Sequence, residues 1–290
     1  MKFTISREVL LQPLSQVVGV VERRQTLPVL ANFMLSARDG GLTVTGTDME
    51  VELISSVPAN VEQDGDITVP ARKLLDIVKA LPDGANINFH VSDDKATLSA
   101  GRSRFTLSTL PASEFPATDQ VETLESIAVG ESTLKKMLDK TSFAMANQDV
   151  RYYLNGLLFD FASQQLRAIA TDGHRLAICD LESGVSVGSD RQLIVPRKGV
   201  MELTRMLSDA DDEVILAIGR NHVRLVKGDT TFTSKLIDGR FPDYRAVVPV
   251  GADNQMLVDK STFIQALQRA SILSNEKYKG VRLEAAGSTI

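Results

Sequence analysis

Two matching stretches decide the fold of this chain: residues 68–81 read TVPARKLLDIVKAL, and residues 194–207 read IVPRKGVMELTRML. Their Val-Pro pairs begin at Val69 and Val195, which are 126 positions apart. The Phe-Pro pairs downstream, at Phe115 and Phe241, have the same offset. Two independent landmarks with one spacing indicate a repeat of domain size.

Further matches extend the repeat in both directions. GTDMEVEL from Gly46 resembles ATDGHRLAI from Ala170, and helix-like segments begin at Ser6, Glu131 and Lys260. A third copy therefore begins near the end of the chain, and GVRLEAAG from Gly280 is its next expected strand. We predict domains at residues 1–122 and 123–249 and the start of an incomplete third domain at 250–290.

Hydrophobic periodicity predicts an α+β fold with antiparallel sheet. Leu10, Leu14 and Val17 recur at helical spacing, as do Leu74 and Val78 in the second predicted helix. Strand segments alternate apolar and polar residues, and the Gly-Asp pair after residue 227 predicts a hairpin between residues 223–226 and 231–235. Each repeat then has two helices against antiparallel strands.

Composition narrows the class of protein. The 290 residues are 43% hydrophobic and 24% charged with a net charge of -5, which is typical of a globular chain. The single cysteine, Cys179, excludes an internal disulfide and favours a reducing cytoplasm, where we expect it to be a buried structural thiol. The sequence has no apolar run long enough to predict a membrane span. We find no metal-ligand spacing, cofactor motif or catalytic motif, and therefore expect no metal, no cofactor and no enzyme.

The predicted helices are basic although the protein is acidic, whereas acidic residues gather in loops. One set of cationic side chains recurs through all three repeats: Arg7, Arg23, Arg24, Arg72, Lys73, Lys79, Lys135, Lys136, Lys140, Arg197, Lys198, Arg205, Lys260, Arg269 and Lys277. Lys and Arg are ordinary on solvated helices, but repetition over five helices favours a shared basic surface. Such a surface contacts phosphates without reading bases.

Several long segments resemble the bacterial beta sliding clamps, the beta subunits of DNA polymerase III. They include TLPVLANFMLSA, RYYLNGLLF, ATDGHRLAIC and DGRFPDYR, and similar stretches cover essentially the whole chain. The resemblance implies clamp domains with sheets outside and helices inside. It also implies a head-to-tail homodimeric ring around double-stranded DNA, opened by a separate clamp loader, which tethers DNA polymerase III and other proteins with a clamp-binding motif.

The resemblance also implies three groups of site residues. For DNA it points to Arg24, Gln148, Arg151, Tyr152, Tyr153 and Lys198. For the partner-peptide pocket it points to Leu154, Thr171, Gly173, His174, Arg175, Leu176, Pro242 and Val247. For the dimer interface it points to Lys73, Arg102, Arg104, Phe105, Leu107, Ile272 and Leu273.

Two other hypotheses stay open from the sequence. A chain with an incomplete third repeat could act as a monomeric peptide-binding platform without forming a ring. Alternatively, Asp172 and His174 could serve a hydrolase, because histidine is a common general base, although no Ser or Cys nucleophile motif accompanies them. Tyr152 and Tyr153 could also be simple strand residues.

Overall fold

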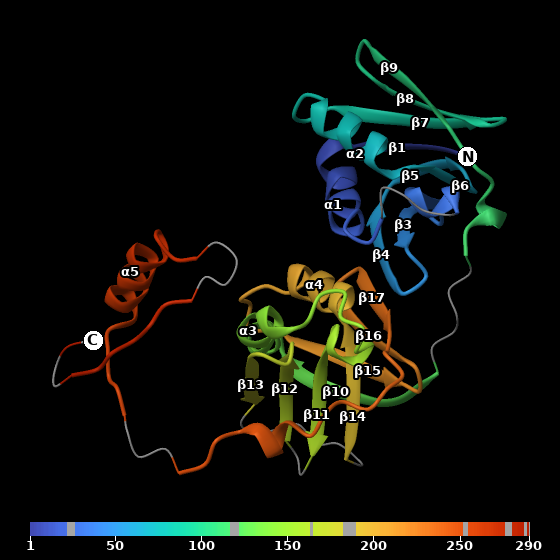
Figure 1. The fold of residues 1–290 in the computed structure, drawn as a ribbon. Helices are drawn as coiled ribbons and strands as arrows, with labels where there is room; N and C mark the ends of the chain where they lie inside the picture. Colours follow the sequence, from blue (N-terminus) through green and yellow to red (C-terminus); the bar gives the residue numbers. More distant parts are fainter. Residues whose placement is uncertain are drawn as a thin grey trace. The chain divides into compact units, whose positions relative to one another are not determined.

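A computed structural model describes residues 1–21, 27–116, 122–162, 165–181, 190–251, 255–275, 280–286 and 289. The chain forms two compact units, Met1–Pro242 and Asp243–Ile290, and each is described by itself. The first unit contains the first predicted domain and residues 123–242 of the second (Figure 1). No helix in the described ranges is long and apolar enough to cross a membrane.

The first strand of the first repeat pairs with strands that come later in the same repeat, and its first helix contacts the second helix. A five-stranded antiparallel sheet has the order β5-β1-β7-β8-β9. Its strands are β1 (Lys2–Ser6), β5 (Asn60–Gln63), β7 (Asn86–Ser92), β8 (Lys95–Ala100) and β9 (Ser103–Ser108). Strand β9 is therefore an edge strand of this sheet.

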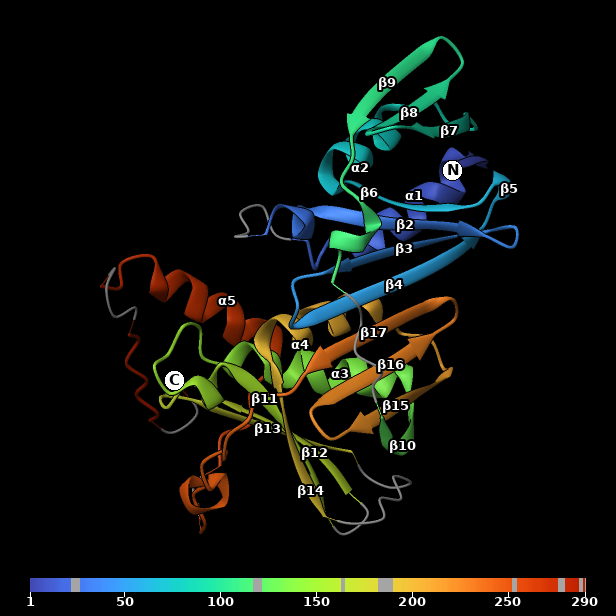
Figure 2. The ribbon, with the colours of Figure 1, turned by 90° about the vertical axis from the view of Figure 1, so that its right-hand side faces the viewer.

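The largest sheet joins the two repeats. It has eight antiparallel strands in the order β10-β15-β16-β17-β4-β3-β2-β6. The strands are β2 (Asn32–Arg38), β3 (Gly41–Thr47), β4 (Val51–Pro58), β6 (Gly65–Pro70), β10 (Thr123–Gly130), β15 (Glu213–Gly219), β16 (His222–Lys227) and β17 (Thr230–Lys235). The β4–β17 ladder connects one repeat to the other, so their sheets are continuous (Figure 2).

The second repeat has a further sheet with the order β13-β12-β11-β14, in which β13 is an edge strand. Its members are β11 (Gly156–Ala162), β12 (Gln165–Thr171), β13 (Leu176–Leu181) and β14 (Arg191–Pro196). Cys179 lies in β13 and is half-buried rather than buried, because its side chain packs only at the margin of the core.

Four helices lie where the repeat predicts them. They are α1 (Arg7–Val17), α2 (Ala71–Ala80), α3 (Glu131–Thr141) and α4 (Arg197–Met206). Ser6 caps α1 by accepting a hydrogen bond from the Val9 amide, which satisfies one free N–H group of the first turn. The predicted apolar faces of α1 and α2 are buried in a core that runs through both repeats. This confirms the α+β fold and the predicted helices.

The second unit holds η5 (Tyr244–Val247) and α5 (Lys260–Ser271), so the helix predicted from Lys260 is confirmed. Asp259 caps α5, and hydrogen bonds from the Thr262 amide and hydroxyl lower the pKa of its carboxyl to about 2. The strand predicted from Gly280 is wrong for the described residues, since 280–285 form no strand. A strand needs a partner ladder, and the structure describes only one bridge there, between Ala286 and Thr289.

Candidate DNA-binding and partner-binding surfaces

The turn Thr171–Arg175, predicted as part of the peptide pocket, is held by its own side chains. The Thr171 hydroxyl accepts from the Gly173 amide at 3.1 Å and donates to the Arg175 carbonyl at 2.7 Å. Asp172 Oδ1 accepts from the amides of His174 and Arg175, at 2.9 and 3.0 Å. Gly173 has φ +87°, which explains glycine at this position. The turn is a rigid support for exposed side chains.

The electrostatics of Asp172 fit this structural role. Burial raises the pKa of the carboxyl, but hydrogen bonds from the His174 and Arg175 amides outweigh it, so the pKa is lowered. Asp172 Oδ2 pairs with Arg175 Nε at 3.1 Å. Both carboxylate oxygens thus serve the turn rather than orienting the exposed His174 imidazole. This arrangement does not support the hydrolase hypothesis, which needs a positioned base.

A neighbouring loop, predicted to contact DNA, touches the same turn. Arg151 donates to Asp149 through Nε at 3.0 Å and Nη2 at 2.8 Å, and these bonds lower the pKa of Asp149 to about 2. Arg151 Nη2 also donates to the Asp172 carbonyl at 3.3 Å. A Cβ at Gly173 would lie 3.0 Å from Arg151 Nη1. The predicted DNA loop and the predicted pocket turn are therefore contiguous.

The other predicted pocket residues differ in placement. Leu154 is 2% exposed in η4 (Tyr152–Leu154), and Leu176 is half-buried at the start of β13. Pro242 is exposed at the end of the first unit. Val247 belongs to the second unit, so the structure does not place it against the turn. The pocket assignment stays a prediction.

The predicted DNA residues are also only partly brought together. Gln148 is exposed with φ +58°, and Tyr152 is 56% exposed, with its ring edge-on to Tyr153 at 5.7 Å. An exposed ring beside a cation suits stacking on a base. Arg24 lies outside the described residues. The Lys198 ammonium is bound by the first repeat, where it donates to the Val20 carbonyl at 2.9 Å and pairs with Asp48 Oδ2 at 2.5 Å.

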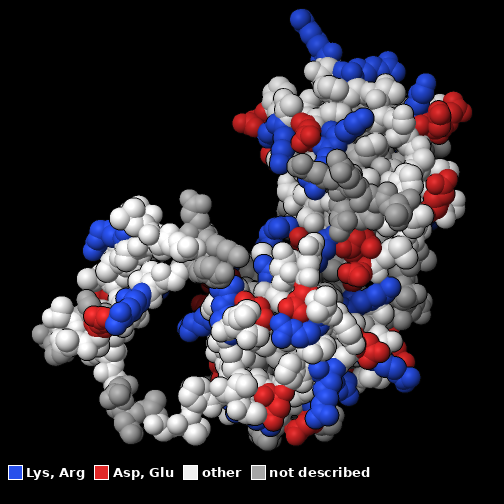
Figure 3. Space-filling view, in the orientation of Figure 1, with Lys and Arg blue, Asp and Glu red and all other residues white. Residues whose placement is uncertain are grey.

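The helical cations are less segregated than predicted. Arg7 is not on a free surface: its guanidinium donates to the carbonyls of Val78 and Lys79 at the end of α2, both at 3.2 Å. Lys135 pairs with Asp139 and Asp209. Figure 3 shows basic and acidic groups side by side on the face drawn. Arg23 and Lys277 lie outside the described residues. Several helical cations remain exposed, namely Arg72, Lys73, Lys79, Lys136, Lys140 and Arg205.

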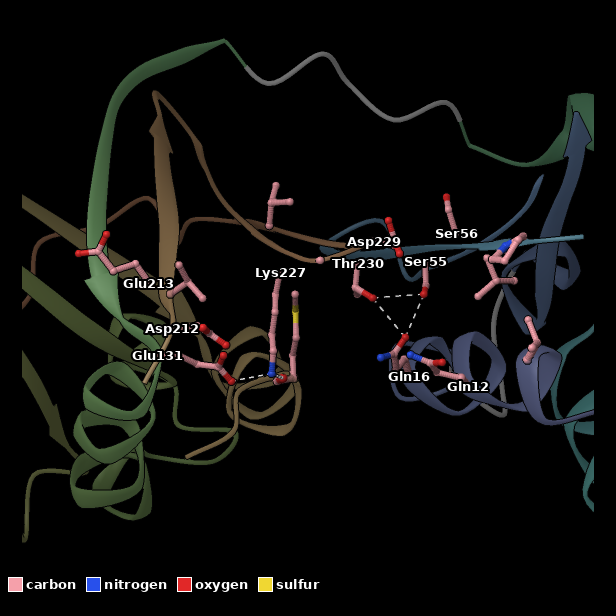
Figure 4. A pocket seen from close by; sticks show the side chains of 17 residues that line it. Gln12, Gln16, Ser55, Ser56, Glu131, Asp212, Glu213, Lys227, Asp229 and Thr230 are labelled. Atoms are coloured by element: carbon pink, nitrogen blue, oxygen red, sulfur yellow. Dashed lines mark hydrogen bonds and ion pairs between the residues drawn. The ribbon is translucent and has the colours of Figure 1, made fainter. Parts of the chain in front are cut away.

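A polar cavity of about 880 Å³ lies where the two repeats meet, and the sequence did not predict it (Figure 4). On one side Glu131, which is 1% exposed, accepts from Lys227 Nζ at 2.5 Å and from the Ser208 hydroxyl at 2.5 Å. On the other side Gln16 Oε1 accepts from the hydroxyls of Ser55 and Thr230, at 2.9 and 3.2 Å. The Gln16 contacts bind α1 and β4 of the first repeat to β17 of the second, whereas the Glu131 contacts lie within the second repeat.

The predicted dimer residues lie at an open sheet edge, on α2 and in the second unit. Phe105 in β9 is half-buried, whereas Leu107 is 7% exposed and already belongs to the core. Arg102, Arg104 and Lys73 are exposed. Ile272 and Leu273 are strongly exposed at the end of α5. The structure leaves most of these side chains available for an interface.

Known proteins match this chain over nearly all of its length. A family model for the N-terminal domain of the DNA polymerase III beta subunit matches residues 1–119, and one for its central domain matches 128–243. A beta sliding clamp of Pseudomonas aeruginosa is 50% identical over 100% of this chain and 79% of its own length. The chain belongs to the beta sliding clamp family. Escherichia coli has a relative that is 49% identical over 98% of this chain and 77% of its own.

Solved beta sliding clamps have the same fold. A P. aeruginosa clamp bound to griselimycin superposes with a TM-score of 0.91 at 51% identity, over 96% of this chain and 76% of that one. A Caulobacter crescentus clamp gives 0.86 at 40% identity, over 95% and 76%. Family membership confirms the resemblance found in the sequence and the repeated clamp architecture. It does not favour the monomeric platform as the function.

Proposed function

We propose that this beta sliding clamp acts as a processivity factor that encircles duplex DNA as a head-to-tail dimer. The β4–β17 junction carries the proposal, because it pairs the last strand of one repeat with an earlier strand of its neighbour. In the repeat order, β9 corresponds to β17 and β13 corresponds to β4. Both β9 and β13 are edge strands. Free edges of these two kinds can continue the same head-to-tail pairing.

Phe105 supports this assignment of the interface. FTLS from Phe105 corresponds to FTSK from Phe232, and Phe232 is fully buried opposite Leu53 at the filled junction. Phe105 occupies the same position on the open edge and is only half-buried. A partially buried aromatic on an edge strand is a strong candidate for an interface anchor. Arg102, Arg104 and Lys73 would supply charges around it, and Ile272 and Leu273 of a second copy of the chain would be its apolar partners.

DNA contact in this proposal is electrostatic and independent of sequence. Exposed helical cations, together with Arg24, would compensate phosphate charge, and such contacts weaken as salt rises. Gln148, Arg151, Tyr152 and Tyr153 form a loop with both donors and stacking surfaces. No base edge need be read, so the protein can slide.

The partner site in this proposal is the turn Thr171–Arg175 with Leu154, Leu176 and Pro242, all of which lie in the first unit. It would take a short motif of DNA polymerase III and of other clamp-binding proteins. Tethering raises the effective concentration of the polymerase at the primer end, which requires no covalent chemistry. The clamp is therefore not an enzyme, and ring opening falls to a separate loader.

Retention on DNA of defined topology tests the function. The loader and the clamp are incubated with nicked circular DNA, excess protein is removed by gel filtration, and the circle is then cut once. A linked ring should be retained on the circle and released from the linear product. Equal retention on circular and linear DNA would contradict encirclement, and no retention on either would leave only the monomeric platform.

A further inference from the structure

The two Thr-Asp turns of the repeats share one hydrogen-bond pattern. In the first repeat, the Thr47 hydroxyl accepts from the Met49 amide and donates to the Val51 carbonyl, both at 3.0 Å. Asp48 Oδ1 accepts from the amides of Glu50 and Val51, at 2.9 and 2.7 Å. Met49 has φ +75°, the counterpart of Gly173. The first turn is thus the structural equivalent of Thr171–Arg175.

The two turns differ in the cation that binds the second carboxylate oxygen. Asp172 Oδ2 pairs with Arg175 of its own turn. The equivalent position in the first turn is Val51, which has no charge. Asp48 Oδ2 instead pairs at 2.5 Å with Lys198 Nζ, which comes from α4 of the second repeat. The Asp48 side chain is 6% exposed, so this ion pair is largely shielded from solvent.

Lys198 makes a second contact with the first repeat in the turn that follows α1. Its Nζ donates to the Val20 carbonyl at 2.9 Å, next to Val21, whose carbonyl accepts from Arg72 at 3.2 Å. Helix α1 has no basic residue in its own last turn. A cation near a helix C-terminus offsets the partial negative charge of the free carbonyls. Lys198 provides this charge from the neighbouring repeat.

The same face of α4 continues the contact. Glu202 follows Lys198 by one turn, and its carboxylate pairs with Arg205 Nη1 at 2.7 Å. A Cβ at Gly19 would overlap this pair, so α4 and the segment after α1 approach closely. Residues 198, 202 and 205 are spaced to lie on one helical face. Lys198 is therefore embedded in a docking contact between the repeats.

We infer that Lys198 is a positioning residue that holds α4 of the second repeat on the Asp48 turn and on the turn that follows α1. A phosphate could bind this ammonium only by competing with the Asp48 carboxylate and the Val20 carbonyl. The inference goes beyond the proposed function, because it concerns the joint between repeats and can be tested without DNA.

Hydrogen exchange of backbone amides, followed by mass spectrometry, tests it directly. Lys198→Gln removes the positive charge of the ion pair. Asp48→Asn removes the negative charge while keeping Oδ1 as an acceptor for the turn. Each should speed exchange in peptides covering 18–21 and 48–51 by about tenfold, the size expected for a lost charged hydrogen bond. Lys198→Arg should restore slow exchange. Lys136→Gln, an equal charge change on an exposed lysine of α3, is the matched control and should change nothing.

Salt titration of binding to a labelled duplex separates the positioning role from direct phosphate contact. Lys198→Gln should leave the slope of log affinity against log salt unchanged, whereas loss of one phosphate contact makes this negative slope shallower by about 1. The inference is overturned if Lys198→Gln or Asp48→Asn leaves hydrogen exchange at the joint unaltered. It is also overturned if Lys198→Gln makes the salt slope shallower by about 1. Both readouts remain interpretable if the protein proves not to encircle DNA.

Discussion

Phe232 of β17 lies directly opposite Leu53 of β4 in the ladder that joins the two repeats, and both side chains are buried. The sheet therefore passes from one repeat to the next without an edge. Phe105 on β9 is the counterpart of Phe232 at an edge that the first unit leaves open. The place beside the last strand of a repeat is thus filled by β4 next to β17, whereas the first unit leaves it free next to β9.

Replacing these two phenylalanines should have different effects on stability. Phe232→Ala should reduce the free energy of unfolding by about 3–5 kcal/mol, because it leaves a cavity at the centre of the joint. Phe105→Ala should reduce it by only about 1 kcal/mol, since the side chain is half-buried. Urea denaturation measures both values. Similar losses would contradict the distinction between a filled and an open junction.

Phe105→Ala should instead weaken self-association. Truncating an interface anchor costs about 2 kcal/mol or more, which is roughly a thirtyfold rise in the dimer dissociation constant. Sedimentation equilibrium at several concentrations measures the constant. Ile215→Ala, which truncates an exposed apolar residue in the interior of the eight-stranded sheet, is the control and should leave the constant unchanged.

Glu131→Gln should destabilise the fold in a manner that depends on pH. Burial raises the pKa of Glu131, but hydrogen bonds from Lys227 and Ser208 outweigh it and hold the pKa below its ordinary value of 4.5. A carboxyl whose pKa is lower in the folded than in the unfolded state stabilises the fold at pH values above its unfolded pKa. This stabilisation is lost as the pH falls through the folded pKa. At pH 7 the variant should lose about 1–3 kcal/mol of unfolding free energy.

The difference between wild type and Glu131→Gln should therefore shrink as pH falls below about 4.5. Denaturation series at pH 7, 5 and 3.5 would follow it. A difference that grows on acidification would show that the carboxylate does not stabilise the folded state in its charged form.

Glu202→Gln should behave in the opposite way. Burial raises the pKa of Glu202, and the pairing with Arg205 does not fully compensate. A carboxyl whose pKa is higher in the folded than in the unfolded state favours folding at low pH. This stabilisation is lost as the pH rises through the folded pKa. Because the partner Arg205 is largely exposed, the ion pair contributes little, and we expect an unfolding free energy at pH 7 within about 1 kcal/mol of wild type.

The comparison of the two glutamine variants at one pH is the decisive measurement. Glu131→Gln should be clearly less stable than Glu202→Gln at pH 7, although both replace buried carboxylates on helices. The reverse order would contradict the assigned pKa directions.

Gly173→Ala should impair partner binding without unfolding the protein. An alanine there must adopt a strained φ of +87° and bring its Cβ against the Arg151 guanidinium, so the turn or that side chain has to shift. Affinity for a labelled peptide with a clamp-binding motif should fall about tenfold or more, measured by fluorescence anisotropy. Gly40→Ala has a similar φ, +74°, but open space around the Cβ. It should bind the peptide as wild type does, and equal loss in both variants would exclude a local effect on the pocket.

Local patterns in the sequence predicted most elements within the repeats. Helix starts at residues 6, 131 and 260 were readable because a polar or charged residue precedes an apolar stripe at helical spacing. The β16–β17 hairpin was readable because Gly228 and Asp229 supply a two-residue turn, and Gly228 has φ +53°. The expected strand at 280 was wrong for the described residues, because alternation by itself does not provide a pairing partner.

The sequence by itself determined the period, the helices, the short-range hairpins and, through its resemblance, the family, since each of these depends on neighbours along the chain. Only the tertiary structure decided that β17 pairs with β4, that Lys198 binds Asp48, and that Glu131 binds Lys227. These contacts join residues that are 96 positions apart for Glu131 and Lys227, 150 for Lys198 and Asp48, and 175 to 183 for the pairs of β17 and β4. No spacing rule links such residues, because their proximity follows from how whole sheets and helices pack.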